Sequence, residues 1–373
     1  MRIANVLSLG VKELLGLSRD PMMLALIVFA FSVSIYTAST AMPEQLNKTP
    51  IALVDEDRSP LSRRIADAFM PPYFLTPLLI TQSEMDRRMD AGLDTFALDV
   101  PPDFQRHLLD GDRPVIQLNV DATRMSQAFA GSGYVQSIVA GEIDSFLRRY
   151  RANDAAPIEL AMRVRFNPSL TVAWFSAVIE VVNNVTMLSI ILTGAALIRE
   201  REHGTIDHLL AMPVTPLEIM VGKIWSMALV VLIACGLSLA FVVKGLLSVP
   251  VEGSVSLFLA GAAVHLFATT SMGILLGTVA RSMPQFGMLI VLVLIPLEML
   301  SGGQTPRESM PEFIQYLMLG APTTHFVALA QAILFRGAGL GAVWPQLVFT
   351  AAIGVVLFVL ALVWFRRALL DAA

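Results

Sequence analysis

The sequence is poor in charged residues and almost devoid of cysteine. Only 15% of its 373 residues are Asp, Glu, Lys or Arg, whereas soluble domains carry about 25%. The single cysteine, Cys235, excludes a disulfide framework within one chain. The net charge of −4 gives no sign of nucleic-acid binding. A soluble fold could not bury the 55% of residues that are hydrophobic, so a membrane protein is indicated.

Motifs for catalysis and nucleotide binding are also missing. Leu217 stands where a P-loop ending in Gly222-Lys223 would need its earlier glycine. Neither H-E-x-x-H nor G-x-S-x-G occurs, and the five histidines are scattered. We therefore predict that the chain is not an enzyme and that it holds no catalytic residue, metal or cofactor.

Long apolar runs dominate what is present. About 20 apolar residues cross the roughly 30 Å of hydrocarbon in a bilayer as a helix. Six such spans are predicted, the fifth somewhat short: Met22–Met42, Ser176–Ile198, Ile224–Val243, Leu257–Ala280, Phe286–Ser301 and Val343–Phe365. No small-residue cleavage site follows the first run, so it is interpreted as a retained span rather than a signal peptide.

The distribution of Lys and Arg predicts the orientation of these spans. With the N-terminus in the cytoplasm, the cytoplasmic segments hold nine basic residues: Arg2, Lys12, Arg19, Arg199, Arg201, Lys223, Arg281, Arg366 and Arg367. The two short outer loops hold three: Lys244, Arg307 and Arg336. Basic residues favour the cytoplasmic side, and long translocated segments do not count. Both termini are therefore expected in the cytoplasm.

Residues 43–170 differ from the rest because short β-rich runs alternate there with helical ones. This pattern predicts an α/β domain outside the membrane, in the periplasm of a Gram-negative cell. The predicted order is residues 1–20 as a cytoplasmic interfacial helix, 21–42 as the first span, 43–170 as the α/β domain and 171–373 as a five-helix block. Residues 1–20 could equally extend the first span. Within the block we expect a cytoplasmic loop at 199–223 and outer-loop helices at 308–336.

A few polar side chains stand inside the predicted spans, where burial is costly. Glu180, Asn183 and Asn184 share a helix face, and Glu298 lies near the outer end of the fifth span. They are candidates for a transport path or a dimer interface, although the two glutamates could simply lie at headgroup level. Gly273 and Gly277 form a G-x-x-x-G motif, which is typical of close helix packing.

The loop after the second span is charged and then amphipathic. A charged run leaves the membrane, Gly204 makes a turn, and Thr205 can cap a short helix that Pro213 limits. Thr215, Pro216 and Glu218 then form a capping box that starts the next helix. Such a surface helix can dock in a groove of another protein. The alternative is an ordinary loop that packs on its own bundle.

Here the chain resembles the cytoplasmic signature of type 2 ABC exporter permeases. The resemblance is carried by Glu200-Arg201-Glu202-His203-Gly204-Thr205, then Leu209-Leu210, Pro213, Glu218 and Gly222-Lys223. The order of elements agrees along the whole chain, and the likeness is greatest to the bacterial branch that exports drugs or amphipathic molecules. It implies that the loop is seated on an ATPase subunit. The implied ATPase-coupling residues are Glu200, Arg201, Glu202, His203, Gly204, Thr205, Leu209 and Leu210.

The resemblance also implies the partners and the location. We expect a bacterial inner-membrane permease, a separate ABC ATPase that uses ATP, a second permease copy, membrane lipid around the spans, and a periplasmic adaptor with an outer-membrane channel. The substrate and the choice between homodimer and heterodimer stay open. The alternative function is a non-transporting scaffold or sensor whose outer domain binds an adaptor or a signal.

Overall fold

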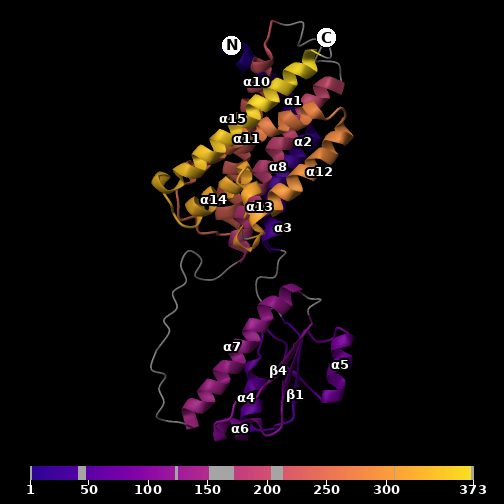
Figure 1. The fold of residues 1–373 in the computed structure, drawn as a ribbon, viewed down its shortest axis with the longest axis vertical. Coiled ribbons are helices and arrows are strands. Elements are labelled where there is room, and N and C mark those ends of the chain that lie inside the picture. The colour runs from indigo at the N-terminus through magenta and orange to yellow at the C-terminus, as the bar shows by residue number, and fades with distance from the viewer. Residues whose placement is uncertain are drawn as a thin grey trace. The chain divides into compact units, whose positions relative to one another are not determined.

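The computed structural model describes residues 2–40, 48–121, 125–150, 172–202, 213–305 and 307–370. It forms two compact units (Figure 1). The helical unit comprises Met1–Met42 and Val164–Ala373, and the α/β unit comprises Pro43–Arg163.

The described part of the helical unit contains only helices and their connections. In chain order its elements are α1 (Ile3–Ser18), α2 (Pro21–Phe29), η1 (Ala30–Ser34), α3 (Ile35–Thr40), α8 (Val172–Glu202), α10 (Pro216–Ser238), η2 (Leu239–Leu246), α11 (Val255–Val279), α12 (Met283–Met299), η3 (Arg307–Ser309), α13 (Glu312–Met318), α14 (Pro322–Leu334) and α15 (Leu340–Leu370). The start of α1 and the end of α15 lie at the same end of this unit (Figure 1).

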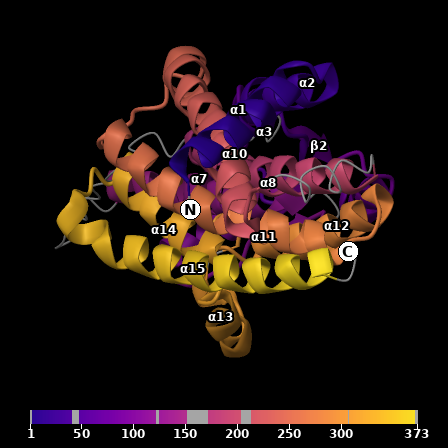
Figure 2. The same cartoon turned by 90° about the horizontal axis from the view of Figure 1, so that it is seen from above.

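Five helical stretches are long and apolar enough to cross a membrane, and a sixth is available if a bent pair counts as one. The five are 21–40, 173–202, 216–246, 255–279 and 340–368. The bent pair is α13 and α14, whose axes differ by 88°, and α13 stands at the margin of the bundle (Figure 2). The predicted fifth span corresponds to α12, which has only 17 residues. The helical membrane fold is thus confirmed. The number of spans is five or six, whereas six were predicted.

The first span is not a regular α-helix throughout. It begins at Pro21, where the side chain of Asp20 caps the helix by accepting a hydrogen bond from Met23 N. Its middle, η1, is a π-helical segment. Wider π turns inside helices are uncommon and tend to occur at functional sites.

Helix α8 is the central helix of the bundle, with most of its residues buried. Two glycines of α11 allow this helix to pack closely on α8. A Cβ at Gly273 would lie 2.6 Å from the Ile190 carbonyl oxygen, and a Cβ at Gly277 would lie 3.1 Å from the Gly194 carbonyl oxygen. The predicted role of this glycine motif in close helix packing is confirmed.

Hydrogen bonds join the same two helices. Thr186 Oγ1 lies 2.9 Å from His265 Nε2, and Ser189 Oγ donates to Thr269 Oγ1 at 2.6 Å. Such interhelical bonds contribute about 0.6 kcal/mol each on average in membrane proteins.

The α/β unit is built on one mixed sheet. Its elements are β1 (Ile51–Asp55), α4 (Pro60–Ala68), β2 (Leu78–Ile80), α5 (Gln82–Asp90), β3 (Phe96–Val100), α6 (Phe104–Asp110), β4 (Gln117–Val120) and α7 (Met125–Tyr150). The strand order is β2-β1-β3-β4, with β1 parallel to β2 and β3, and β4 antiparallel to β3.

Side chains alternate between the two faces of this sheet and form two cores. Leu53 and Phe96 lie in a larger core beneath α4, α6 and α7, whereas Ala52 and Ala97 face α5 in a smaller one. Figure 1 shows α5 on one side of the sheet and α7 on the other. Helices on both faces explain why the central strands are buried and apolar.

Candidate functional site

Four consecutive charged residues at the end of α8, Arg199–Glu202, are here called the charged strip. Each of its side chains reaches a different part of the helical unit. The helix carries them around its circumference at about 100° per residue, so they point in different directions. The end of the bundle where they lie is called the strip end, and the opposite end the far end.

Arg199 connects the strip to the first span. Its guanidinium forms an ion pair with the carboxylate of Asp20. Asp20 also caps α2, so one carboxylate both starts the first span and holds it to α8.

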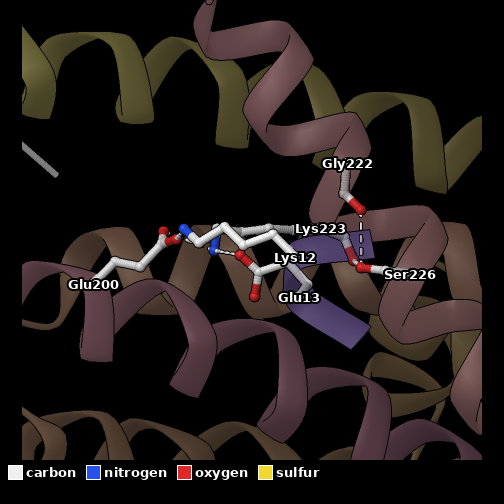
Figure 3. Close-up of polar contacts among 6 residues, drawn as sticks. All are labelled: Lys12, Glu13, Glu200, Gly222, Lys223 and Ser226. Atoms are coloured by element: carbon white, nitrogen blue, oxygen red, sulfur yellow. Dashed lines mark hydrogen bonds and ion pairs between the residues drawn. The ribbon is translucent and has the colours of Figure 1, made fainter. Parts of the chain in front are cut away.

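Glu200 belongs to a cluster with Lys12, Glu13 and Lys223, called here the lysine–glutamate cluster (Figure 3). Lys223 Nζ lies 2.6 Å from Glu13 Oε1 and 2.7 Å from Glu200 Oε2. Lys12 Nζ lies 2.7 Å from Glu200 Oε1. Two lysines and two glutamates from α1, α8 and α10 therefore neutralise one another at the strip end.

Arg201 and Glu202 hold the turn between α11 and α12. Arg201 Nη1 donates to the carbonyl of Ala280 at 2.6 Å, at the C-terminal end of α11. Glu202 Oε1 accepts from Met283 N at 2.9 Å, in the first turn of α12. A cation at a helix C-terminus and an anion at an N-terminus are the favourable placements, so each residue stabilises the helix end that it contacts.

Helix α1 is fastened to the start of α10 near this cluster. The predicted capping box is confirmed, since Thr215 Oγ1 accepts from Glu218 N at 3.3 Å and Glu218 Oε2 accepts from Thr215 N at 2.9 Å. Glu218 also accepts hydrogen bonds from Arg2 N and from Asn5 Nδ2. Helix α1 ends at Ser18 and α2 begins at Pro21, so the two are separate helices.

The structure thus places three of the predicted coupling residues, Glu200, Arg201 and Glu202, in contacts with their own bundle. The other five, His203, Gly204, Thr205, Leu209 and Leu210, lie outside the described residues. Sequence reasoning missed the partners Lys12, Glu13 and Lys223 as site residues. A usable signal was Lys223, a lysine two turns inside an apolar helix, because an isolated buried charge needs a counter-charge.

A second polar group lies towards the far end, between the first span and α8. Asn184 Nδ2 donates to the Ala30 carbonyl at 2.8 Å, and Ser34 Oγ donates to Glu180 Oε1 at 2.7 Å. Ala30 and Ser34 are the ends of η1. The amide of Asn184 therefore satisfies a backbone carbonyl at the π-helical segment, a contact that the sequence does not reveal.

The predicted path residues are only partly brought together. Glu180 and Asn184 share a hydrogen bond at 3.5 Å, and Glu298 lies within electrostatic range of Glu180. Asn183 is buried but takes no part in these hydrogen bonds within the described residues. Glu180 also lines a cavity of about 330 Å³ with Phe175 and residues 303–304 of the loop after α12.

This geometry can transmit movement. Any displacement of the end of α8 acts on α1, the first span, α10, α11 and α12 through separate short polar contacts. The far-end cavity lies on the same helix α8, at Phe175 and Glu180. A rigid helix of this length thus links the charged strip to a cavity at the opposite end of the bundle.

Comparison with known proteins agrees with this architecture. Residues 22–363 match the model of the ABC-2 family transporter protein. The chain is 59% identical to the inner membrane transport permease YhhJ of Escherichia coli K12 over 98% of both chains. It is 27% identical to the probable multidrug ABC transporter permease YbhR of the same organism, over 92% of this chain and 94% of that one. The chain therefore belongs to the ABC-2 family of transporter proteins and is a multi-span membrane permease subunit of an ABC transporter.

Proposed function

We propose that the chain exports a drug-like or amphipathic molecule across the bacterial inner membrane, driven by a separate ABC ATPase. Family membership implies the ATPase, and the probable multidrug function in the name of YbhR supports the substrate class. The strip end faces the cytoplasm together with both termini, because it gathers Arg199, Arg201, Arg281 and Arg367. The α/β unit then lies in the periplasm.

The proposed mechanism rests on one observation: the four side chains of the charged strip contact different neighbouring helices. ATP-driven movement of the loop 203–212 pulls on Glu202 and Arg201 first, since they adjoin it in sequence. Through the turn between α11 and α12 the pull reaches α12, whose far end approaches Glu180 at Glu298. The far-end cavity opens as a result.

The assembly is a dimer of permeases with two ATPase subunits. The α/β unit receives a periplasmic adaptor that leads to an outer-membrane channel. Glu180, Asn184 and Glu298 form a polar part of the path, with Asn183 buried beside them. The apolar character of the other spans suits an amphipathic cargo.

The proposal is tested by uncoupling. In a background where Cys235 is replaced by alanine, Gln304→Cys places a thiol on an exposed residue of the far-end cavity. With the ATPase subunit present, ATP should raise the rate at which a water-soluble maleimide labels this thiol. Glu202→Ala should reduce that increase while ATP hydrolysis continues, because the hydrogen bond to Met283 N is lost.

Glu202→Gln is the matched control. Its amide oxygen can still accept from Met283 N, so ATP should raise labelling as in the parent. Removal of a helix-capping group costs about 0.5–2 kcal/mol, enough to reduce coupling by roughly two- to thirtyfold. If Glu202→Ala responds to ATP as strongly as the parent, the strip is not the transmitting element.

A further inference from the structure

A basic pocket of about 520 Å³ lies at the strip end, between α11 and α15. Three arginines line it, one from each of three segments: Arg201 from the end of α8, Arg281 after α11, and Arg367 from α15. Trp364 forms part of the same wall. This volume is within the range of about 300–1,000 Å³ that is usual for small-ligand sites.

No carboxylate neutralises these arginines within the described part of the chain. The ion pairs described at the strip end join other residues, namely Arg199 with Asp20 and the members of the lysine–glutamate cluster. Glu202, the nearest acid in sequence to Arg201, accepts from Met283 N on the α12 side. Arg201 is held in place by the carbonyl of Ala280. Among the described residues, the pocket thus presents positive charge that no carboxylate balances, and Arg201 is already held in position.

The surface beside the pocket is apolar and exposed. Val279 on α11 and Val363 on α15 are exposed large hydrophobic residues within about one turn of Arg281 and Arg367, and the exposed Leu360 lies about two turns before Arg367. Trp364 is 49% exposed, and tryptophan is enriched where hydrocarbon meets headgroups. Helix α15 is mostly exposed along its span and lies at the margin of the bundle (Figure 2). The pocket therefore opens where a lipid-facing surface ends.

We propose that this pocket binds the phosphate headgroup of an anionic membrane lipid. Arg201, Arg281 and Arg367 hold the phosphate oxygens, since guanidinium groups bind phosphate through paired N–H donors. The acyl chains run along Val279, Leu360 and Val363. Basic pockets between membrane helices are known to take such headgroups. The bound lipid joins α11 to α15 and contacts Arg201, so it supports the charged strip itself.

An apolar flank favours a lipid over the other anions that arginines attract. Free phosphate would use the arginines but would gain nothing from Val279 or Leu360. An acidic surface of the ATPase would use the arginines but would gain nothing from the exposed hydrophobic residues of α11 and α15. A lipid-binding experiment distinguishes an anionic lipid, free phosphate and an acidic surface of the ATPase.

Thermal unfolding of the full-length permease in a neutral detergent is followed with increasing dioctanoyl phosphatidylglycerol, dioctanoyl phosphatidylcholine or inorganic phosphate. We expect saturable stabilisation by phosphatidylglycerol alone. The double variant Arg281→Gln/Arg367→Gln should bind it about tenfold or more weakly, because basic residues near the membrane surface attract anionic lipids. Arg366→Gln is the matched control, since Arg366 is exposed on the same turn of α15 but does not line the pocket.

Several results would overturn the assignment. Equal stabilisation by phosphatidylcholine would mean that the headgroup charge is not recognised, and an equal effect of inorganic phosphate would mean a plain anion site. If Arg366→Gln weakened lipid binding as much as the double variant, the lipid would be attracted by the general positive charge of this surface and not by the pocket. If the double variant kept its lipid response but lost affinity for the ATPase subunit, the arginines would be a protein interface. Circular dichroism of both variants shows whether they retain their helices.

Discussion

At the scale of single residues, the account depends on which charges at the strip end are buried. Lys223 is only 3% exposed and lies between Glu13 and Glu200, whereas Lys12 is 51% exposed. Removing one partner of a buried ion pair leaves an uncompensated charge and costs about 3–5 kcal/mol. An exposed pair contributes about 0–1 kcal/mol. Both lysines contact Glu200, but the loss of Lys223 should lower stability far more than the loss of Lys12.

Lys223→Met should lower the apparent melting temperature of the permease in detergent strongly, because Glu13 would lose its counter-charge and Glu200 would keep only the exposed Lys12. Lys12→Met should lower it slightly, since water can replace the lost contact. Thermal unfolding of both variants at one pH checks the difference. Equal shifts for the two would contradict the view that the lysine–glutamate cluster is organised around Lys223.

At the scale of elements, local signals were predictable and distant pairings were not. The capping box at Thr215 depends on neighbours in sequence, and it is found as expected. The cap at Asp20 and the turn at Gly337, whose φ is +65°, are local features of the same kind. The π-helical segment in the first span was not predicted. Asn184, whose side-chain amide donates to the Ala30 carbonyl of this segment, lies 154 residues away in the sequence.

The ends of the spans also depend on distant contacts that the sequence does not reveal. The apolar run of the second span stops at Ile198, but the helix continues through the charged strip to Glu202. Charged residues end an apolar run without ending a helix when side chains of other helices satisfy them. The sequence therefore marked the strip as unusual but could not reveal that its side chains bind their own bundle.

Helix α1 offers a test of packing at this scale. A Cβ at Gly10 would lie 2.1 Å from the ring of Trp225 on α10, whereas a Cβ at Gly16 would meet nothing within 4 Å. Gly10→Ala should push α1 away from α10 and lower stability. Gly16→Ala should be neutral or raise stability by up to about 1 kcal/mol, because alanine favours a helix over glycine.

Thermal unfolding measures both effects, and the environment of Trp225 gives a second readout. Its Nε1 donates to the Val6 carbonyl at 3.2 Å, so a displaced α1 should shift tryptophan emission in Gly10→Ala but not in Gly16→Ala. If Gly10→Ala behaved like Gly16→Ala in both measurements, α1 would not be docked on α10 in solution.

At the scale of the whole molecule, composition and the order of apolar runs were enough to predict a multi-span permease. They were not enough to settle the number of spans, since α12 has 17 residues and α13 and α14 form a sharply bent pair. Whether a bent or short apolar helix spans depends on tertiary neighbours and on the bilayer. The alternation of strands and helices in residues 43–170 did indicate the sheet that the α/β unit contains.

The central claim is that the loop following the charged strip receives force from a separate ATPase in the cytoplasm. The most direct measurement is photocrosslinking in membranes that contain both subunits, with a photoreactive residue in place of Thr205 and, as control, of Ser254 at the start of α11. Ser254 is exposed at the far end. The account predicts a crosslink to the ATPase from position 205 and none from position 254, and the reverse pattern would contradict it.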